Sequence, residues 1–308
     1  MRVLFVSSGR GGKVSILVQN QGESVRNAGI EVDFFIFKGI GLKGYFKSLP
    51  ALRKTIIQGR YDLVHAHYSV SAIITTLASR TPVVVSLMGS DIYGSFMTRS
   101  LIRCLAKRRW SATIVKTDKM YDLLNLKRAV VIPNGVNLDF FRHESRNIAR
   151  ERLNIPAAAK IVLFVSTHDR PEKNFSLAQK SVSLLKEEGI ELLYVKNAEH
   201  ALIPSYLNAA DLLLLTSVYE GSPNIVKEAM ACNCPIVSTD VGDVQKIFGN
   251  TRGCYLTTYD PAEIASKIMQ AMDLRTRTEG RQRIISLGLD SSSVARRIID
   301  IYKSVADN

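Results

Sequence analysis

Short apolar segments alternate with amphipathic helical segments along this chain, and the alternation starts afresh once. The strand-like apolar segments are residues 2–6, 30–37, 61–65, 82–87, 113–116 and 129–132, then 160–165, 190–195, 211–216, 235–238 and 253–256. Between them, apolar residues recur every three or four positions, as in Val14–Ala28, which ends at Gly29. Strands that alternate with helices predict parallel sheets covered on both faces. The sequence therefore predicts an α/β fold of two doubly wound, Rossmann-like domains.

The second series of strands, which begins after Asn154, places the domain boundary. The stretch 137–154 is polar and charged, and 308 residues suffice for about two domains. We expect an N-terminal domain at residues 1–145 and a C-terminal domain at 146–308. The last helical segment, 291–305, either stays in the second domain or crosses back to the first. Because doubly wound sheets bind ligands beyond the carboxyl ends of their strands, the natural site is a cleft between the two domains.

The charge is distributed unevenly between the two halves. The formal net charge is +13, and residues 1–152 carry +14 while residues 153–308 carry −1. Such asymmetry indicates an anionic partner of the first half, with solubility as the plain alternative. No nucleic-acid-binding module is present in the sequence, so we expect no nucleic acid partner.

Two basic segments, 37–49 and 99–110, also contain aromatic and aliphatic residues. This combination suits anionic headgroups or a lipid pyrophosphate acceptor, although solvated helix faces look the same. The segment 1–9 predicts a first strand rather than a secretory signal, and no apolar run reaches the ~18 to 20 residues of a membrane span. The four cysteines lack zinc-like spacing. We therefore expect a cytoplasmic protein with reduced thiols and no metal, associated peripherally with an anionic membrane surface.

The segment after residues 211–216 carries most of the chemical information. Ser222 fits a helix N-cap and Pro223 the first helical position, so a helix is predicted to begin there. The free N–H groups and partial positive charge of a helix N-terminus suit phosphate, and Gly221 lets the backbone approach a ligand closely. Asn224 and Glu228, four residues apart, share one face of this helix.

Two carboxylates flank this turn, because Glu220 precedes it and Glu228 follows it. A carboxylate beside a phosphate site is unfavourable unless it binds something else, such as sugar hydroxyls. The alternative is a capped helix with glutamates that face solvent.

Glu220 to Glu228 matches the Glu-x7-Glu signature of retaining GT-B glycosyltransferases of the family 4 type. The resemblance extends through 229–243 and back through 203–211. Three further segments resemble the family in the same order, namely 61–67, 89–91 and 132–137. The resemblance implies a GT-B fold, no metal, and transfer of a sugar with retention from a nucleotide diphosphate donor. The acceptor would be a glycan or a lipid-linked glycan precursor.

The resemblance also implies roles for particular residues. Glu228 would hold the donor ribose and Glu220 would contact the transferred sugar. The backbone of Gly221, Ser222, Pro223 and Asn224 would contact the donor sugar or diphosphate. Gly11 and Gly12 would lie near the donor phosphates and the acceptor.

The family places an Arg and a Lys after the first strand of the second domain. Lys173 with Asn174 matches this pattern, whereas Thr167 occupies the usual position of the arginine. Arg170 lies three residues before Lys173 and is the candidate substitute. Such cations suit a diphosphate whose charge grows as the glycosidic bond breaks. We therefore expect Glu220, Lys173 and Arg170 to be catalytic.

The first domain departs from the family pattern at one position. Met88 stands where many members have a histidine, and a thioether cannot replace an imidazole as a hydrogen-bonding or charged group. Asp91, His65 and His67 are the remaining candidates there for acceptor or sugar contact.

Three other functions remain open. A nucleotide-sugar epimerase on the same fold would convert donor without acceptor, and a non-enzymatic member would only bind sugar nucleotide. A dinucleotide oxidoreductase is a weaker alternative, because Gly9-x-Gly11 is present but Val14 occupies the third glycine position of that fingerprint.

Overall fold

The structure, a computed structural model, describes residues 1–10, 13–38, 41–89, 91–92, 96–166, 170–274 and 276–307. The chain forms two compact units. Unit 1 comprises Met1–Gly135 and Ser291–Asn308, and unit 2 comprises Val136–Asp290. The division thus falls slightly before the boundary expected at residue 145, and the last helix belongs to unit 1.

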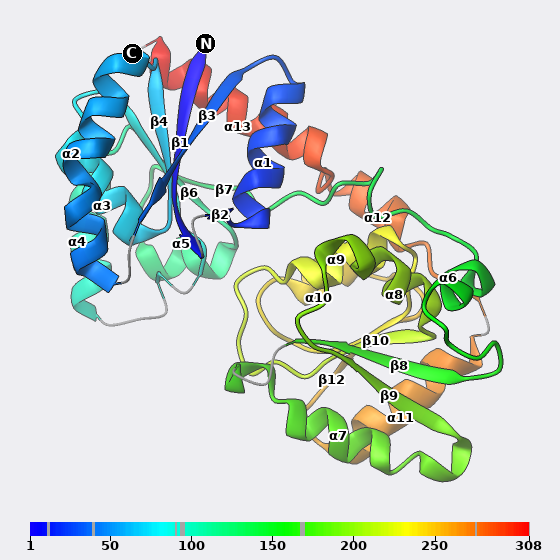
Figure 1. Ribbon diagram of the computed structural model, residues 1–308. Coiled ribbons are helices and arrows are strands. Elements are labelled where there is room, and N and C mark those ends of the chain that lie inside the picture. Colours follow the sequence, from blue (N-terminus) through cyan, green and yellow to red (C-terminus); the bar gives the residue numbers. More distant parts are fainter. Residues whose placement is uncertain are drawn as a thin grey trace. The chain divides into compact units, whose positions relative to one another are not determined.

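Unit 1 is built on a mainly parallel sheet (Figure 1). In spatial order its strands are β3 (Glu31–Phe37), β1 (Arg2–Arg10), β4 (Leu63–His67), β5 (Val83–Ser86), β6 (Ala112–Val115) and β7 (Ala129–Val131), and β2 (Lys13–Val14) pairs antiparallel with the end of β1. Successive side chains of β1 point to opposite faces, so Val3 and Phe5 enter one core cluster and Leu4 and Val6 another.

Helices cover both faces of this sheet. The helices of one face are α1 (Ile16–Asn27) and α13 (Ser291–Ala306), and those of the other are α2 (Gly41–Gly59), α3 (Ser69–Ala78), α4 (Phe96–Arg108) and α5 (Asp118–Leu124). No described helix has the length and apolar character needed to cross a membrane.

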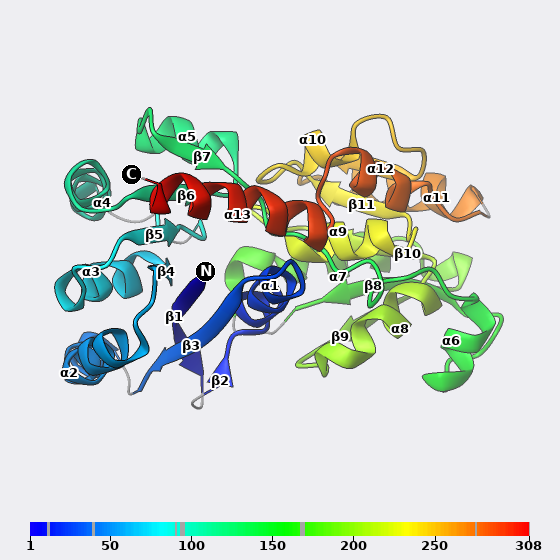
Figure 2. The same cartoon turned by 90° about the horizontal axis from the view of Figure 1, so that it is seen from above.

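Helix α13 resolves the open question about the C-terminal segment. Val294, Ile298 and Tyr302, each four residues apart, form one buried stripe that packs in the same cluster as Val3 and Phe5. The helix lies beside α1 (Figure 2). Burial of this stripe therefore places α13 in unit 1, although it follows unit 2 in sequence.

Unit 2 contains a five-stranded parallel sheet. Its strands in spatial order are β12 (Cys254–Thr257), β11 (Ile236–Thr239), β10 (Leu212–Leu215), β8 (Lys160–Val165) and β9 (Ile190–Val195). Helices α7 (Phe175–Ser183) and α11 (Pro261–Asp273) cover one face, and α8 (Ile203–Ala209), α9 (Asn224–Ala231), α10 (Val244–Phe248) and α12 (Gly280–Ser286) cover the other. The remaining elements of unit 2 are α6 (Arg146–Arg152), η1 (Pro171–Lys173), η2 (Lys186–Glu188) and η3 (His200–Leu202).

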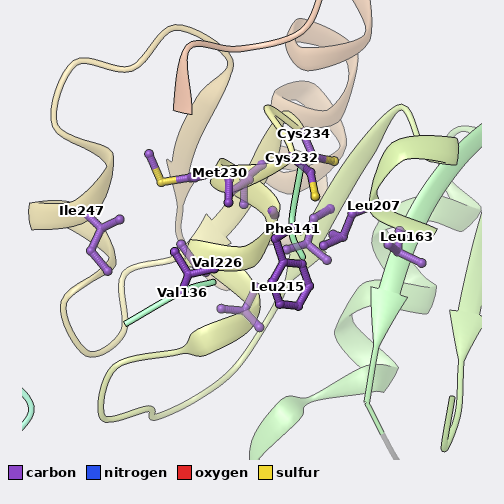
Figure 3. Packing of buried hydrophobic residues seen from close by; sticks show 14 of the residues in the cluster. Val136, Phe141, Leu163, Leu207, Leu215, Val226, Met230, Cys232, Cys234 and Ile247 are labelled. Carbon is purple, nitrogen blue, oxygen red and sulfur yellow. The ribbon is translucent and has the colours of Figure 1, made fainter. Parts of the chain in front are cut away.

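The larger core of unit 2 fixes α9 in place. Figure 3 shows Val226 and Met230 of α9 among the buried side chains around Phe141. Both residues are fully buried. Burying an aliphatic side chain contributes about 1.5–3 kcal/mol, so this face holds the helix and the turn before it against the sheet.

Candidate functional site

Helix α9 begins one residue later than the sequence suggested. The helix starts at Asn224, and Pro223 is its N-cap residue with an extended ψ of 114°. Pro223 has no polar side chain with which to cap the helix. The prediction that Ser222 is the N-cap is therefore wrong: its hydroxyl instead accepts a hydrogen bond from Lys227 Nζ at 2.9 Å.

The loop after β11 packs closely against the turn that precedes α9. A Cβ atom at Gly242 would lie 2.2 Å from the carbonyl oxygen of Gly221, and the φ of Gly242 is +61°. Only glycine fits such an approach in this backbone conformation. Gly242 therefore helps to hold the turn 221–224 at the carboxyl ends of β10 and β11.

Lys173 and Glu220 form an ion pair inside unit 2, although 47 residues separate them in sequence. Their side chains are only 10% and 14% exposed. The same Glu220 Oε1 accepts a hydrogen bond from Ser217 Oγ at 3.0 Å. Glu220 is thus a held, paired carboxylate and not a glutamate that faces solvent.

Hydrogen bonds to backbone carbonyls join the two loops that carry this ion pair. Thr216 Oγ1 lies 3.0 Å from the carbonyl oxygens of both Lys173 and Asn174. The Val218 N–H donates to the Glu172 carbonyl at 2.8 Å. The loops after β8 and β10 therefore form one rigid support at the carboxyl edge of the sheet.

Arg170 lies in the same loop as Lys173 but makes a different contact. Its Nε donates to Glu172 Oε1 at 2.7 Å, and its side chain is 51% exposed. Burial alone would raise the pKa of Glu172, but hydrogen bonds from its own backbone N–H and from Arg170 outweigh this effect and lower the pKa. Thr167 lies outside the described residues.

Glu228 keeps part of its surface open to solvent, but protein atoms surround its carboxyl group. This burial raises the pKa of Glu228 to about 7, and the nearby Lys227 ammonium opposes the rise. Glu228 is therefore poised to change charge near neutral pH, unlike an ordinary surface glutamate.

Two buried acceptor atoms near this turn have no hydrogen-bond partner within the described chain. They are Oδ1 of Asn224, the first residue of α9, and Oδ1 of Asp243, in the loop after β11. A buried acceptor left without a donor costs about 1–3 kcal/mol, so such atoms point to a ligand that supplies donors. Sugar hydroxyl groups are donors of this kind.

The candidates of unit 1 that the structure describes, His65, His67 and Asp91, do not form a comparable site. His65 and His67 are fully buried, and their rings stack at 4.3 Å. His65 lies 2.5 Å from the Tyr302 hydroxyl, and His67 Nε2 lies 2.7 Å from Gln21 Oε1. Burial lowers the pKa of His67 to about 3 and that of His65 well below its ordinary value. Both rings are thus neutral core groups with no surface to offer a sugar.

The carboxylate of Asp91 accepts hydrogen bonds from Ser69 and Met88. Its Oδ1 accepts hydrogen bonds from the N–H and hydroxyl of Ser69 at 2.8 and 2.9 Å, and its Oδ2 accepts from the N–H of Met88 at 2.7 Å. Asp91 therefore ties the loop after β5 to the start of α3. Gly11 and Gly12 lie outside the described residues.

Sequence reasoning missed Lys227. The residue is 1% exposed, and burial lowers its pKa to about 8. A signal was present in the sequence, because Lys227 lies one helical turn before Met230 and Ala231, two apolar residues of the same helix.

Among the described residues, no group of three or more His, Cys, Asp and Glu side chains is arranged to hold a metal ion.

Comparison with known proteins bears on both units. Residues 8–140 match the family described as Glycosyltransferase Family 4, and residues 179–273 match the family described as Glycosyl transferases group 1. TuaC of Bacillus subtilis (strain 168), which its name assigns to teichuronic acid biosynthesis, is 28% identical over 219 residues. The match covers 61% of this chain and 55% of TuaC, so it spans little more than half of that relative.

Solved structures share the whole architecture at low identity. Sucrose-phosphate synthase from Thermosynechococcus elongatus superposes with a TM-score of 0.81 and 18% identity, over 99% of this chain and 98% of that chain. HepE from Anabaena, in complex with UDP-glucose, superposes with a TM-score of 0.77 and 18% identity, over 99% and 100%. The fold is therefore GT-B, and the matched families support a GT-B glycosyltransferase.

Proposed function

We propose that this chain transfers a sugar from a nucleotide diphosphate donor, bound by unit 2, to a glycan or lipid-linked acceptor, with retention of configuration. The buried Lys173–Glu220 pair beside the α9 turn is the observation that carries the proposal. One cation, one held carboxylate and a helix N-terminus together suit a sugar joined to a diphosphate.

The proposed roles follow from the chemistry of each group. Lys173 and the α9 turn stabilise the negative charge that the diphosphate gains when its bond to the sugar C1 breaks. Glu220 and the Asn224 amide accept hydrogen bonds from sugar hydroxyls, and Glu228 accepts them from the ribose. The acceptor oxygen bonds to C1, and its proton passes to the leaving phosphate. Arg170 adds a second cation if it releases Glu172.

A thermal-shift panel tests donor binding. We expect one sugar nucleotide among UDP, GDP, ADP and CMP conjugates to raise the melting temperature, because a ligand that binds only the folded state stabilises it by about 2.7 kcal/mol at 100 times Kd. NAD and NADP serve as negative controls. A response to NAD alone would instead favour a dinucleotide enzyme.

Acceptor dependence separates the remaining functions. With the identified donor and no acceptor, conversion of the donor sugar into an epimer would contradict the transferase proposal. Binding without transfer or hydrolysis, across the glycan and lipid-linked acceptors tested, would favour a non-enzymatic protein.

We further propose that unit 1 docks on an anionic membrane surface through α2 and α4. Residues 34–117 contain thirteen Lys and Arg but only two acids. Both helices lie on one face of the sheet (Figure 1). Each of them exposes large apolar side chains. Those on α2 are Phe46 and Ile57, and those on α4 are Phe96, Met97 and Leu101.

Vesicle sedimentation tests this surface. We expect binding to phosphatidylglycerol vesicles and none to phosphatidylcholine vesicles. Replacing Lys43, Lys47 and Lys54 with Gln should weaken binding about 100-fold, since each basic residue near the surface contributes about 1 kcal/mol. In the matched control, Gln replaces three exposed lysines of unit 2, namely Lys180, Lys186 and Lys196. Equal loss in both triple variants would show general charge attraction and contradict a docking face.

A further inference from the structure

Lys227 lies buried directly behind the turn that starts α9. Side chains of an α-helix lean toward its N-terminus, so Lys227 reaches back along the first turn. Its Nζ donates to Ser222 Oγ at 2.9 Å, on the residue that precedes the N-cap. The residue is only 1% exposed, so its ammonium acts from inside the unit.

The Ser222 hydroxyl connects this lysine to a carboxylate. Ser222 also hydrogen-bonds Asp243, so the hydroxyl accepts from Lys227 and donates to Asp243. Asp243 lies in the loop after β11, next to Gly242, whose backbone contacts Gly221. Lys227, Ser222 and Asp243 therefore join helix α9, its entry turn and the neighbouring loop.

The charges around Lys227 are unbalanced toward acid. Asp243 and Glu228 both act on the Lys227 ammonium and favour its charged form, against the effect of burial. Helix α10 adds Lys246, which acts on Asp243. Helix α12, which packs on α9, adds Arg281, whose guanidinium donates to the carbonyls of Leu138, Phe141 and Ala231.

Burying a lysine ammonium at this position costs desolvation free energy, which a purely structural side chain would avoid. A methionine of similar length would fill the same space without the desolvation of a charge. A full positive charge behind a helix N-terminus does add to the partial charge that the helix itself presents to an anion. The position of the charge thus suits a ligand that carries phosphate.

Resting on the donor site proposed above, we propose that Lys227 is a positioning residue that fixes the Ser222–Asp243 arrangement and adds positive charge behind the turn that receives the donor diphosphate. Lys227 acts through the turn, and it contributes to the affinity for the phosphate groups of the donor. Its loss should not alter the affinity for the nucleoside.

Calorimetric titration of Lys227→Met tests this role. The probes are the nucleoside diphosphate identified by the thermal-shift panel and its nucleoside without phosphate. We expect the affinity for the diphosphate to fall at least 10-fold and that for the nucleoside to change less than 2-fold. Lys180→Met, on the exposed surface of α7, is the matched control and should behave like the wild type.

The pH dependence provides a readout that a purely structural lysine would not move. Because the pKa of Lys227 is lowered to about 8, wild-type affinity for the diphosphate should fall between pH 8 and pH 9.5 as the ammonium is lost. That decline should be absent in Lys227→Met. Ser222→Ala keeps the lysine and should lose about 3-fold in affinity for the diphosphate. This variant replaces Lys227→Met as the test if Lys227→Met does not fold.

The outcomes separate this inference from the proposed function. A wild-type protein that binds no nucleoside diphosphate contradicts the donor site itself. Wild-type binding with equal diphosphate affinity in Lys227→Met or, if it is unfolded, in Ser222→Ala overturns only the role of Lys227. Parallel losses for the diphosphate and the nucleoside also overturn it, because they show a general structural effect.

Discussion

We expect Lys173→Met and Glu220→Gln each to reduce the proposed sugar transfer at least about 100-fold while the protein stays folded. Removing one preorganised group that stabilises developing charge typically costs 10²–10³-fold in rate. In the proposed mechanism Lys173 and Glu220 are such groups, since two bridged loops hold them and their side chains are at most 14% exposed. The measurement is the initial rate of transfer from the identified donor, with purified variants whose folding is checked by circular dichroism.

The stability of the same variants distinguishes a functional pair from a structural one. Each single substitution leaves a mostly buried partner unpaired and should reduce the free energy of unfolding by about 2 kcal/mol. The double variant Lys173→Met/Glu220→Gln removes both charges and should recover most of this stability without recovering transfer. Denaturant titration of the four proteins completes the cycle.

Arg152→Met is the matched control for this experiment. Arg152 pairs with Glu144 in the same unit, and its side chain is 46% exposed. An exposed pair contributes about 0–1 kcal/mol, so this variant should lose little stability and no activity. Wild-type turnover in either folded single variant of the Lys173–Glu220 pair would remove both residues from the site.

The strands of both units could be predicted because burial on both faces leaves continuous apolar runs. Leu212–Leu215 is such a strand, and all four of its residues are buried. The end of β1 was harder to predict, since the strand-like apolar run stops at residue 6 whereas β1 continues to Arg10. In the structure, Gly9 pairs with Val14, and a Cβ there would lie 2.4 Å from Ile36. The glycine therefore permits close packing inside a strand.

The contacts between side chains at the site were harder to predict from the sequence. Spacing identified Glu220 and Glu228 around one turn, but it could not show that Lys173 meets Glu220, because that contact depends on two adjacent parallel strands. Position at a strand end suggested His65 and His67 as ligand contacts. Helix α13 covers that face through Tyr302, and a contact across 237 residues leaves no local signal.

We expect Glu228→Gln to make the protein more stable and to weaken its binding of the proposed donor at pH 8. In the folded protein the pKa of Glu228 is about 7, raised by burial from the ordinary 4.5. Between these two values the folded state retains a proton that the unfolded state has lost, so stability falls as pH rises through this range. The full shift corresponds to about 3 kcal/mol, and we expect about 2 because the residue as a whole is partly open to solvent.

Glutamine is the uncharged counterpart of the protonated acid and avoids this loss. Denaturant unfolding should therefore show Glu228→Gln about 2 kcal/mol more stable than the wild type at pH 8 and equal to it at pH 4. Glu187→Gln, at an exposed glutamate of the same unit, is the control and should show no difference at either pH.

Donor binding should change in the opposite direction. A hydrogen bond from a ribose hydroxyl to a carboxylate contributes about 1.5–3 kcal/mol, so Glu228→Gln should bind the donor about 10- to 100-fold more weakly at pH 8. Wild-type affinity should decrease as pH falls from 8 to 6 and Glu228 takes up its proton, whereas the affinity of the variant should not follow this change. A variant that gains stability but binds donor as tightly as the wild type would show that the buried carboxylate serves something other than the donor. A gain in stability together with a loss of donor affinity is expected only of a functional carboxylate. Burying its negative charge lowers the stability of the protein, and the ligand requires that charge.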